Sequence, residues 1–520
     1  MDSGSIQILI AMIIYIAVVI GIGVYFAKRA NESSDNFLIG GRKMGPWVVA
    51  MGAEASDMSG WLLMGLPGVA YFLGLSDAIW TAIGLAIGTY LNWLFVAKRL
   101  RVYSHLAGDA ITIPDFLSNR FKENKKVIMT IAALFILVFF TVYASSCFVT
   151  FGKLFSTLFD AKYVYVMIAG AVFVVAYTFI GGFLAESVSD FMQGIIMIFA
   201  LAAVLIVGIT AAGGVSQVVE NARAIPGFLD FFGIATPKLV DGVQQLDANS
   251  KPIFEAAGRY GFLTIISTMS WGLGYFGMPQ VLLKFMSIKK AADLKLSRRV
   301  AAIWVVISLG AAVVIGIVGR ILFPSELLTA SAAESIFIVL SKDFFLPFIA
   351  GIVMAGILAA TISSADSYLL ISASALSKNI YQGLFRKKAS DKSVLWISRI
   401  TLVVIAIIAV VIALDENSVI FKVVSFAWAG FGATFGPVML FSLFWKRITR
   451  AGAVAGMVAG GGMVFIWKLL IRPIGGALGI YELLPAFIFS CIVIIIVSLL
   501  TKEESKEIQD EFESVKAFRE

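Results

Sequence analysis

Cysteine, histidine and charged residues are all scarce in this chain of 520 residues. The two cysteines, Cys147 and Cys491, fall within apolar stretches, so we expect free packing residues and no disulfide framework. The single histidine, His105, lies in a basic segment, which excludes an intramembrane Ser–His pair and a zinc site of the HExxH type. Only 14% of the residues are charged, against about 25% in an average soluble protein.

The sequence signatures of two other classes of membrane protein are missing as well. The chain has no glycine-flanked aspartate motif of the kind that intramembrane aspartyl proteases use, and no carbonyl-filter sequence such as TVGYG. An intramembrane enzyme and an ion channel are therefore both disfavoured, and we expect no enzymatic activity.

Long hydrophobic runs are what the chain has in abundance. It is 60% hydrophobic with a mean hydropathy of +0.94, and stretches long enough to cross a bilayer as helices recur from end to end. This pattern predicts an all-α integral membrane protein with about 13 transmembrane helices. The expected spans are 6–26, 46–73, 76–97, 127–158, 163–180, 189–211, 259–283, 300–322, 345–377, 395–413, 418–445, 451–471 and 480–500.

The distribution of charge predicts the orientation of these spans. If the N-terminus lies outside and the C-terminus in the cytoplasm, most of the 41 Lys and Arg fall in cytoplasmic loops. Cytoplasmic loops are enriched in Lys and Arg, so the net charge of +8 reflects topology rather than nucleic-acid binding. We therefore expect a multi-pass protein of the cell inner (cytoplasmic) membrane, in contact with membrane lipid.

The structure of two segments outside the spans can also be predicted. The external loop 212–258 is long enough to hold short helices and a gate, although a passive connection is an equal alternative. The charged tail 501–520 places four apolar residues on one helical face, which predicts a short helix on the inner membrane surface. Those residues are Ile508, Phe512, Val515 and Phe518.

Two of the expected spans are interrupted. In the second span the stretch 52–60 breaks the apolar run, and in the seventh the stretch 270–279 contains three glycines and ends at Pro279. Glycine adds backbone freedom and proline removes a donor, so both helices are expected to open. The interruptions lie five spans apart in spans of opposite direction, as in inverted-repeat transporters with a site at the midplane. Two ordinary kinks are the weaker interpretation.

Hydroxyls and carboxylates gather near these interruptions. Asp57 lies within the first, and a charge at membrane depth costs about 2.5–3.5 kcal/mol even on a lenient scale, so it usually faces a cavity. In the ninth span Ser363, Asp366 and Ser367 share a helix face, and Ser364 and Ser367 lie three apart. Such hard oxygen ligands suit Na⁺, whereas serines bonded to the preceding turn are the alternative.

A further acid, Asp190, follows Glu186 at the cytoplasmic start of the sixth span. Acidic residues favour helix N-termini, so helix capping and ion binding explain this pair equally well.

Aromatic residues accompany both interruptions. Trp271 and Tyr275 lie four apart in the second one, Trp61 closes the first, and Tyr143 interrupts the fourth span. Aromatic residues in membrane proteins are more often core or interfacial than ligand contacts. Trp271 and Tyr275 gain weight because they share a face of an interrupted helix.

Several of these stretches together resemble one transporter family. The run 55–68 (ASDMSGWLLMGLPG) is long and specific, 113–117 (IPDFL) is short, and 177–185 (YTFIGGFLA) fixes the register of Asp190. With 271–277 (WGLGYFG) and the serines of the ninth span, they resemble the sodium/solute symporter family over essentially the whole chain, and most closely its proline branch.

The resemblance implies a LeuT-type core of two inverted five-helix repeats, formed by spans 2–6 and 7–11, with peripheral spans 1, 12 and 13. The implied divisions are 1–45 with the first span and a cytoplasmic loop, 46–211 with the first repeat, 212–258 as the external loop, 259–445 with the second repeat, 446–500 with spans 12 and 13, and 501–520 as the cytoplasmic tail.

The resemblance also implies site residues. The sodium ligands would be the carbonyls of Ala55, Met58 and Ala360 and the hydroxyls of Ser363 and Ser364, the last of which is often threonine in the proline branch. The positions around the substrate pocket are Ser59, Trp61, Tyr143, Trp271, Tyr275 and Pro279. Asp57 and Asp190 match acids linked to sodium dependence. Asp366 departs from the proline branch, and Asp190, Asp366 and Ser367 are candidates for coupling or for a second cation.

The implied function is sodium-coupled secondary active symport that imports L-proline by alternating access. Na⁺ would be the coupling ion, and no organic cofactor is implied. The alternative is the same machinery with another cargo, such as pantothenate or a different small carboxylate. A sugar would require more hydrogen-bonding side chains than the interrupted segments offer.

Overall fold

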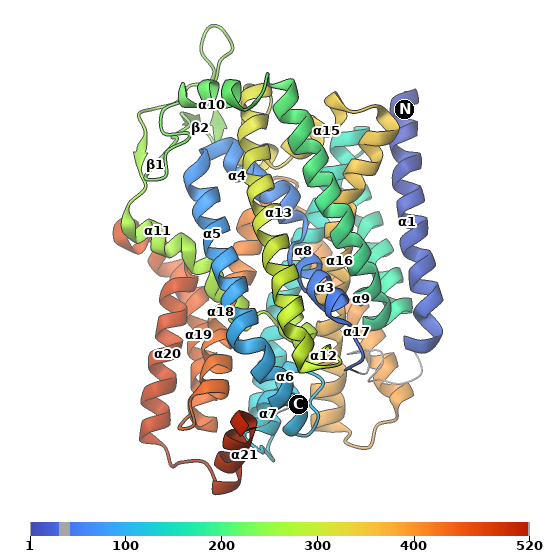
Figure 1. The fold of residues 1–520 in the computed structure, drawn as a ribbon, viewed down its shortest axis with the longest axis vertical. Helices are drawn as coiled ribbons and strands as arrows, with labels where there is room; N and C mark the ends of the chain where they lie inside the picture. Colours follow the sequence, from blue (N-terminus) through green and yellow to red (C-terminus); the bar gives the residue numbers. More distant parts are fainter. Residues whose placement is uncertain (1, 31–41, 518–520) are drawn as a thin grey trace.

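A computed structural model describes residues 2–30 and 42–517 of the protein. Most of its helices run along the long axis of the molecule (Figure 1). Within the described residues, short strands occur only at one end of this axis. The long helices, together with α6, which continues α5, and the tail helix α21, are α1 (Ser3–Ala30), α5 (Leu75–Leu91), α6 (Ala97–Leu106), α8 (Val127–Phe159), α9 (Tyr163–Ala211), α13 (Leu294–Leu322), α16 (Pro347–Ser374), α17 (Asp391–Ile412), α18 (Ile420–Phe444), α19 (Arg450–Ile466), α20 (Leu483–Leu500) and α21 (Lys506–Ala517).

Shorter elements join or extend these helices. They are α3 (Pro46–Asp57), η2 (Trp61–Gly65), α4 (Leu66–Leu73), η3 (Asn92–Val96), α7 (Ile113–Arg120), α10 (Val215–Arg223), α11 (Phe262–Met269), η4 (Ser270–Gly277), α12 (Pro279–Ser287), η5 (Ala291–Asp293), α14 (Ala330–Ala333), α15 (Ile336–Phe344), η6 (Ala375–Phe385), η7 (Trp467–Ile471), η8 (Arg472–Ile474) and η9 (Gly476–Leu478). Four strands of two residues, β1 (Gly233–Ile234), β2 (Leu239–Val240), β3 (Val243–Gln244) and β4 (Gly258–Arg259), pair antiparallel as β1 with β4 and β2 with β3.

Eleven helices within residues 2–30 and 42–517 are long and apolar enough to cross a membrane. Each overlaps one of the expected spans. The two expected spans without such a helix are the second and the seventh, which are the two predicted to be interrupted. The helical fold is confirmed, whereas the count of thirteen crossings stays a prediction.

Both predicted interruptions are present. Helix α3 ends at Asp57, the backbone at Met58 has φ −85° and ψ 68°, and the chain resumes as a π-helix at Trp61. The first break is therefore shorter than the predicted 52–60, because the residues from Gly52 to Asp57 stay helical and buried. In the second, η4 is a 3₁₀-helix, Met278 is extended, and Pro279 opens α12 at a position where its missing N–H costs nothing.

Neighbouring helices satisfy the backbone that the second break exposes. The Asn92 side-chain amide donates to the Tyr275 carbonyl at 2.9 Å, and the Trp428 indole donates to the Trp271 carbonyl at 2.7 Å. Gly88 of α5 packs so closely on Gly272 that a Cβ atom on Gly88 would overlap the Gly272 backbone. Since no water is present in a bilayer core to bond free carbonyls, these contacts make the irregular segment tolerable there.

The fifth and sixth expected spans are joined without a loop. Helix α9 runs from Tyr163 to Ala211, and its one non-helical residue is Gly182, whose φ of 58° lies in a region that favours glycine. The predicted gap between these spans is thus a kink, and it places Glu186 and Asp190 inside a continuous helical segment.

The predicted external loop 212–258 packs on α4 and α5, at the same end of the molecule as the start of α1 (Figure 1). Its Phe228 is buried, the Phe228 carbonyl accepts from the Leu75 N–H at 2.8 Å, and the Leu73 carbonyl accepts from the Ala235 N–H at 3.2 Å. The loop therefore covers the junction of α4 and α5, a position compatible with either a gate or a passive connection.

The tail helix α21 corrects one expectation. It does form, but its apolar face packs on the protein rather than on a membrane surface: Phe512 is 1% exposed and its ring lies 6.4 Å from that of Tyr103 on α6. Lys122 adds ion pairs to Glu507 and Glu511. Phe518 lies outside the described residues. An amphipathic pattern shows that a face must be covered, but it does not show by what.

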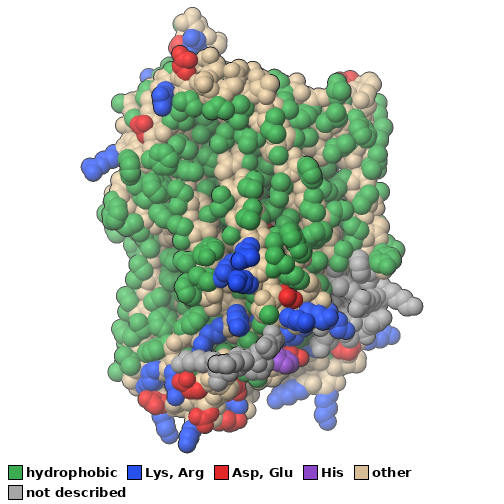
Figure 2. All heavy atoms as spheres, viewed as in Figure 1, with side chains coloured by type: hydrophobic (Ala, Val, Ile, Leu, Met, Phe, Trp, Pro, Cys, Tyr) green, Lys and Arg blue, Asp and Glu red, His purple; other side chains and the backbone are tan. Residues whose placement is uncertain are grey.

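The outer surface has the distribution of side chains expected for a membrane protein. Figure 2 shows a broad hydrophobic band, with most of the visible Lys and Arg at the end where α21 lies and few at the end with the external loop. The start of α1 and helix α21 lie at opposite ends (Figure 1).

Candidate functional site

Hydroxyls of α16 meet the carbonyl end of α3. The Ser363 hydroxyl donates to the Ala55 carbonyl at 2.8 Å and lies 3.1 Å from the Ala360 carbonyl, while the Ser364 hydroxyl is 3.4 Å from the Ala55 carbonyl. All four residues are buried, and so is Met58, at which α3 breaks. The structure thus brings together four of the five predicted sodium ligands and places the fifth at the adjacent break.

Asp57 lies between the two broken segments. It is fully buried, and one carboxylate oxygen accepts from the Gln280 side chain of α12 at 3.3 Å. The other oxygen has no hydrogen-bond partner among the described residues. Because burying an unpaired polar group is costly, this atom marks a place where a cation or water would be favourable.

An aromatic cluster surrounds the break in the seventh span. The rings of Trp61 and Trp271 lie 5.9 Å apart, that of Trp428 lies 6.0 Å from Trp271, and Tyr275 meets Trp428 edge-on at 5.0 Å. The Trp61 indole N–H and the Tyr275 hydroxyl are buried without partners in the described chain. The predicted pocket residues Trp61, Trp271 and Tyr275 are therefore neighbours, and a polar ligand could satisfy their free groups.

The other three predicted pocket residues lie at the edges of this region. Tyr143 packs on Tyr368 with ring centres 4.2 Å apart and donates to the Asp57 carbonyl at 3.4 Å. Ser59 accepts from the Trp61 N–H at 3.5 Å, and Pro279 begins α12. All three are buried.

A cavity of about 560 Å³ reaches the aromatic cluster. Trp271, Phe421 and Tyr481 line one part of it, and Trp271 is the one predicted pocket residue on its wall. Its other walls include the charged residues Asp77, Glu334, Lys422, Lys468 and Arg472. The size suits a small polar molecule.

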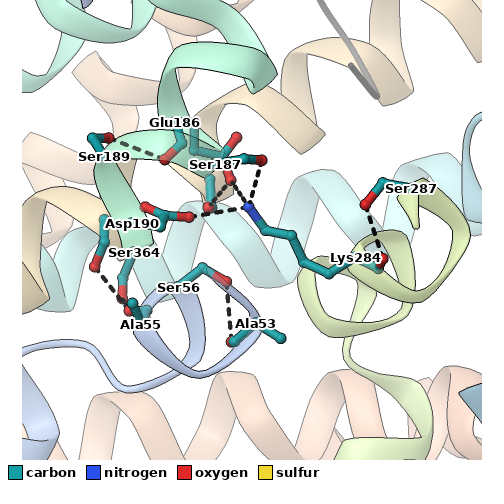
Figure 3. Close-up of polar contacts among 12 residues, drawn as sticks. Ala53, Ala55, Ser56, Glu186, Ser187, Ser189, Asp190, Lys284, Ser287 and Ser364 are labelled. Carbon is teal, nitrogen blue, oxygen red and sulfur yellow. Dashed lines mark hydrogen bonds and ion pairs between the residues drawn. The ribbon is translucent and has the colours of Figure 1, made fainter. Parts of the chain in front are cut away.

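The acids of α9 are paired with a lysine that the sequence analysis did not single out. Lys284 of α12 extends toward α9 (Figure 3), and its ammonium lies 3.0 Å from both Glu186 and Asp190. Ser367 of α16 donates to the same Glu186 oxygen at 2.5 Å. Asp190 and Ser367 thus join one network, whereas both oxygens of Asp366 lack a hydrogen-bond partner among the described residues.

Two missed residues left different signals in the sequence. A lysine in the apolar run PQVLLKFMS, after a helix break, is a buried charge that needs an acid, so Lys284 could have been paired with Asp190. Trp428 left no such signal in the sequence, because a single tryptophan in an apolar helix is typical of a packing residue in the protein core.

Comparisons with known proteins identify the family of this chain. The sequence model described as the sodium:solute symporter family matches residues 37–460. The chain belongs to the sodium:solute symporter family. Among its relatives, the osmoregulated proline transporter OpuE of Bacillus subtilis (strain 168) is 42% identical over 502 residues, covering 96% of each chain. The sodium/proline symporter of Staphylococcus aureus (strain USA300 / TCH1516) is 41% identical over 517 residues, covering 98% of this chain and 96% of the relative.

Solved structures share the fold of this symporter. A Na⁺-coupled sialic acid symporter, in a substrate-bound outward-open state, superposes with a TM-score of 0.77 at 18% identity, over 96% of this chain and 99% of the other. MhsT in complex with L-phenylalanine gives a TM-score of 0.50 at 15% identity, over 87% of this chain and 97% of the other. These likenesses confirm the LeuT-type fold class. The family consists of transporters, so the prediction that the chain is a transporter and not an enzyme is confirmed as well.

Proposed function

We propose that this symporter imports L-proline together with Na⁺ by alternating access, across the cytoplasmic membrane, with its N-terminus outside and its C-terminus in the cytoplasm. The names of the two relatives support proline as the cargo. The gathering of basic residues at the end of the molecule with α21 supports the orientation. The observation that carries the proposal is the meeting of the Ser363 and Ser364 hydroxyls with the Ala55 carbonyl at the broken end of α3.

Sodium would bind between α3 and α16. The carbonyls of Ala55, Met58 and Ala360 and the hydroxyls of Ser363 and Ser364 form a set of hard, neutral oxygens, which suits Na⁺. On binding, each hydroxyl would turn a lone pair toward the ion and give up its bond to the Ala55 carbonyl. The ion would then bridge the first repeat (46–211) to the second (259–445), replacing two weak bonds with a tighter link.

Proline would bind at the aromatic cluster. Its ring would pack on Trp271 and Tyr275, its secondary ammonium would face their π-systems, and its carboxylate would meet backbone N–H groups freed at a helix break. Ser59, Trp61, Tyr143 and Pro279 would complete the pocket. The unpartnered Trp61 indole and Tyr275 hydroxyl support this placement, and the adjoining cavity supplies a route to it.

Asp57 would couple the two ligands. It lies next to the break that would hold sodium and bonds to Gln280 just beyond the break that would hold proline. A charge at that point can favour one arrangement of the two segments when sodium is present. Coupling requires such a difference in affinity between states, because a ligand that binds both states equally shifts nothing.

The available gradient is sufficient for this task. A tenfold sodium gradient is worth about 1.4 kcal/mol and a potential of 100 mV about 2.3 kcal/mol per charge. One sodium per proline therefore supplies about 3.7 kcal/mol, enough for accumulation of several hundredfold. Proline as a zwitterion adds no net charge, so the potential acts on the sodium.

Uptake into proteoliposomes tests the proposal. Purified protein should accumulate radiolabelled proline when sodium is higher outside, and should not do so with equal sodium on both sides or with potassium in its place. A competitor panel containing unlabelled proline and pantothenate separates the two cargoes. Sodium-driven uptake that pantothenate blocks and proline does not would replace proline as the substrate.

A further inference from the structure

Lys284 is a lysine that is almost completely buried near the candidate sodium site. Its side chain is 1% exposed, and its ammonium lies 3.0 Å from three oxygens: those of Glu186, Ser187 and Asp190. An ammonium has three protons to donate, so all three are used. On the remaining side the ring of Phe183 lies 4.6 Å away, in cation–π contact.

The surroundings of this ammonium are acidic. Glu186 and Asp190 contribute one carboxylate each from α9, and Asp366 on the neighbouring helix α16 adds a third, whose two oxygens have no hydrogen-bond partner in the described chain. The pocket therefore holds more acidic groups than the one ammonium can neutralise. Charges buried in this way persist only when they are paired, and here the pairing cation belongs to the protein.

This pocket adjoins the candidate sodium site. A Cβ atom placed on Gly52 of α3 would lie 3.4 Å from the Lys284 ammonium and 3.7 Å from the Asp190 Cβ. Gly52 lies three residues before Ala55, which is about 4.5 Å along a helix. Figure 3 shows Ala55 and Ser364 beside the Asp190 and Lys284 contacts. Gly52 of α3 therefore lies within van der Waals reach of both groups.

We propose that Lys284 is a tethered cation: its ammonium fills the acidic pocket between α9, α12 and α16 and keeps a second sodium from binding there. The inference rests on the proposed sodium coupling and deepens it by fixing the number of ions. Carboxylate and hydroxyl oxygens of this kind are hard ligands that would otherwise accept Na⁺. A lysine supplies the same charge but cannot leave, so it draws no energy from the sodium gradient.

The test compares ion stoichiometry in the parent and in charge variants of position 284. Purified protein is titrated with ²²Na⁺ at saturating proline, and the ratio of ²²Na⁺ to proline is measured in proteoliposome flux. The parent and Lys284→Arg should bind and move one sodium per proline. Lys284→Met, of similar length without the charge, should bind close to two, with a Hill coefficient for sodium rising from about 1 toward 2.

Two controls isolate the charge. Lys153→Met removes another buried lysine, which pairs with Glu334 at 2.7 Å outside this pocket, and should leave the ratio at one. Lys290→Met removes an exposed lysine shortly after α12 and should behave as the parent. If Lys284→Met does not yield folded protein, Lys284→Met combined with Glu186→Gln removes one excess acid and should still bind the second sodium through Asp190 and Asp366.

The outcomes separate this inference from the proposed function. A parent that binds two sodium ions per chain overturns the inference while leaving sodium–proline symport intact. A Lys284→Met protein that still binds one sodium also overturns it. Absence of any sodium-driven proline uptake by the parent overturns the proposed function, and the ²²Na⁺ titration without proline then still reports whether position 284 controls a cation site.

Discussion

Removing the Ser363 hydroxyl should weaken sodium binding far more than it weakens the fold. In the structure this hydroxyl is the one closest to the Ala55 carbonyl, at 2.8 Å, against 3.4 Å for Ser364. In Ser363→Ala the proposed site loses one of five oxygens. A hydrogen bond to a charged group is worth about 1.5–3 kcal/mol, a fair measure for one ion–hydroxyl contact. The sodium concentration for half-maximal proline uptake should therefore rise by roughly ten- to a hundredfold.

The assay is proline uptake in proteoliposomes across a sodium titration, with ²²Na⁺ binding to purified protein as a second measurement. Ser364→Ala should shift the titration in the same direction, and Ser363→Thr, which keeps the hydroxyl, should stay close to the parent. Ser374→Ala is the matched control, since among the described residues the hydroxyl of that buried serine of α16 bonds within its own helix, to the Ile371 carbonyl at 2.9 Å.

Unchanged sodium dependence in both alanine variants would refute the site. Equal shifts in the two variants and in Ser374→Ala would show instead that any loss of a buried hydroxyl on α16 disturbs transport.

Three further predictions test other parts of the site. Asp57→Asn keeps the size of the side chain and removes its charge, so sodium-driven uptake should fall at least tenfold in protein that reaches the membrane; normal uptake at low sodium would make the charge dispensable. Tyr275→Ala and Trp271→Ala should weaken direct proline binding at saturating sodium by roughly ten- to a hundredfold, and parent-like binding in both would move the pocket elsewhere. Gly88→Ala should prevent folding, because its Cβ would overlap the Gly272 backbone, whereas Gly462→Ala, with open space around it, should be neutral or stabilising by up to about 1 kcal/mol; equal melting temperatures in detergent would contradict this difference.

The broken helices and the hydroxyl cluster could be predicted from sequence because their causes are local. Glycine and proline change the conformational freedom and the hydrogen bonding of their own backbone. The composition of the segment 270–279 therefore predicts a break in any fold. Serines three and four apart on a helix share a face in any fold, so Ser363 and Ser367 could be predicted to lie on one side of the helix that the structure shows as α16. The extent of the first break was not predictable in the same way. Residues 52–57 include residues that weaken a helix, yet they remain helical because packing on all sides outweighs propensity.

What sequence could not supply is the partner of each group. Trp428 packs on η4 and donates its indole N–H to the Trp271 carbonyl, although the two residues lie more than 150 positions apart in the chain. The tail helix shows the same limit: Phe512 marks an apolar face, but α6 as its cover follows only from the fold. Pairings of this kind depend on which helices become neighbours, and a single sequence carries no direct signal of that.

The contacts around the seventh span divide into two kinds, and the division indicates where the molecule can open. Asn92 of η3 and Trp428 of α18 donate to backbone carbonyls of η4, and losing these bonds would leave buried donors unsatisfied in a bilayer. Gln280 donates instead to the Asp57 carboxylate of α3, and ions or water can take over such a bond, whereas Lys284 holds α12 to the acids of α9. We infer that η3, η4 and α18 move as one unit, and that alternating access separates α12 from α3 while Lys284 stays in its pocket on α9. Sodium bound at the proposed site at the end of α3 would act on this second kind of contact, so it would influence when the proposed proline pocket opens without touching proline.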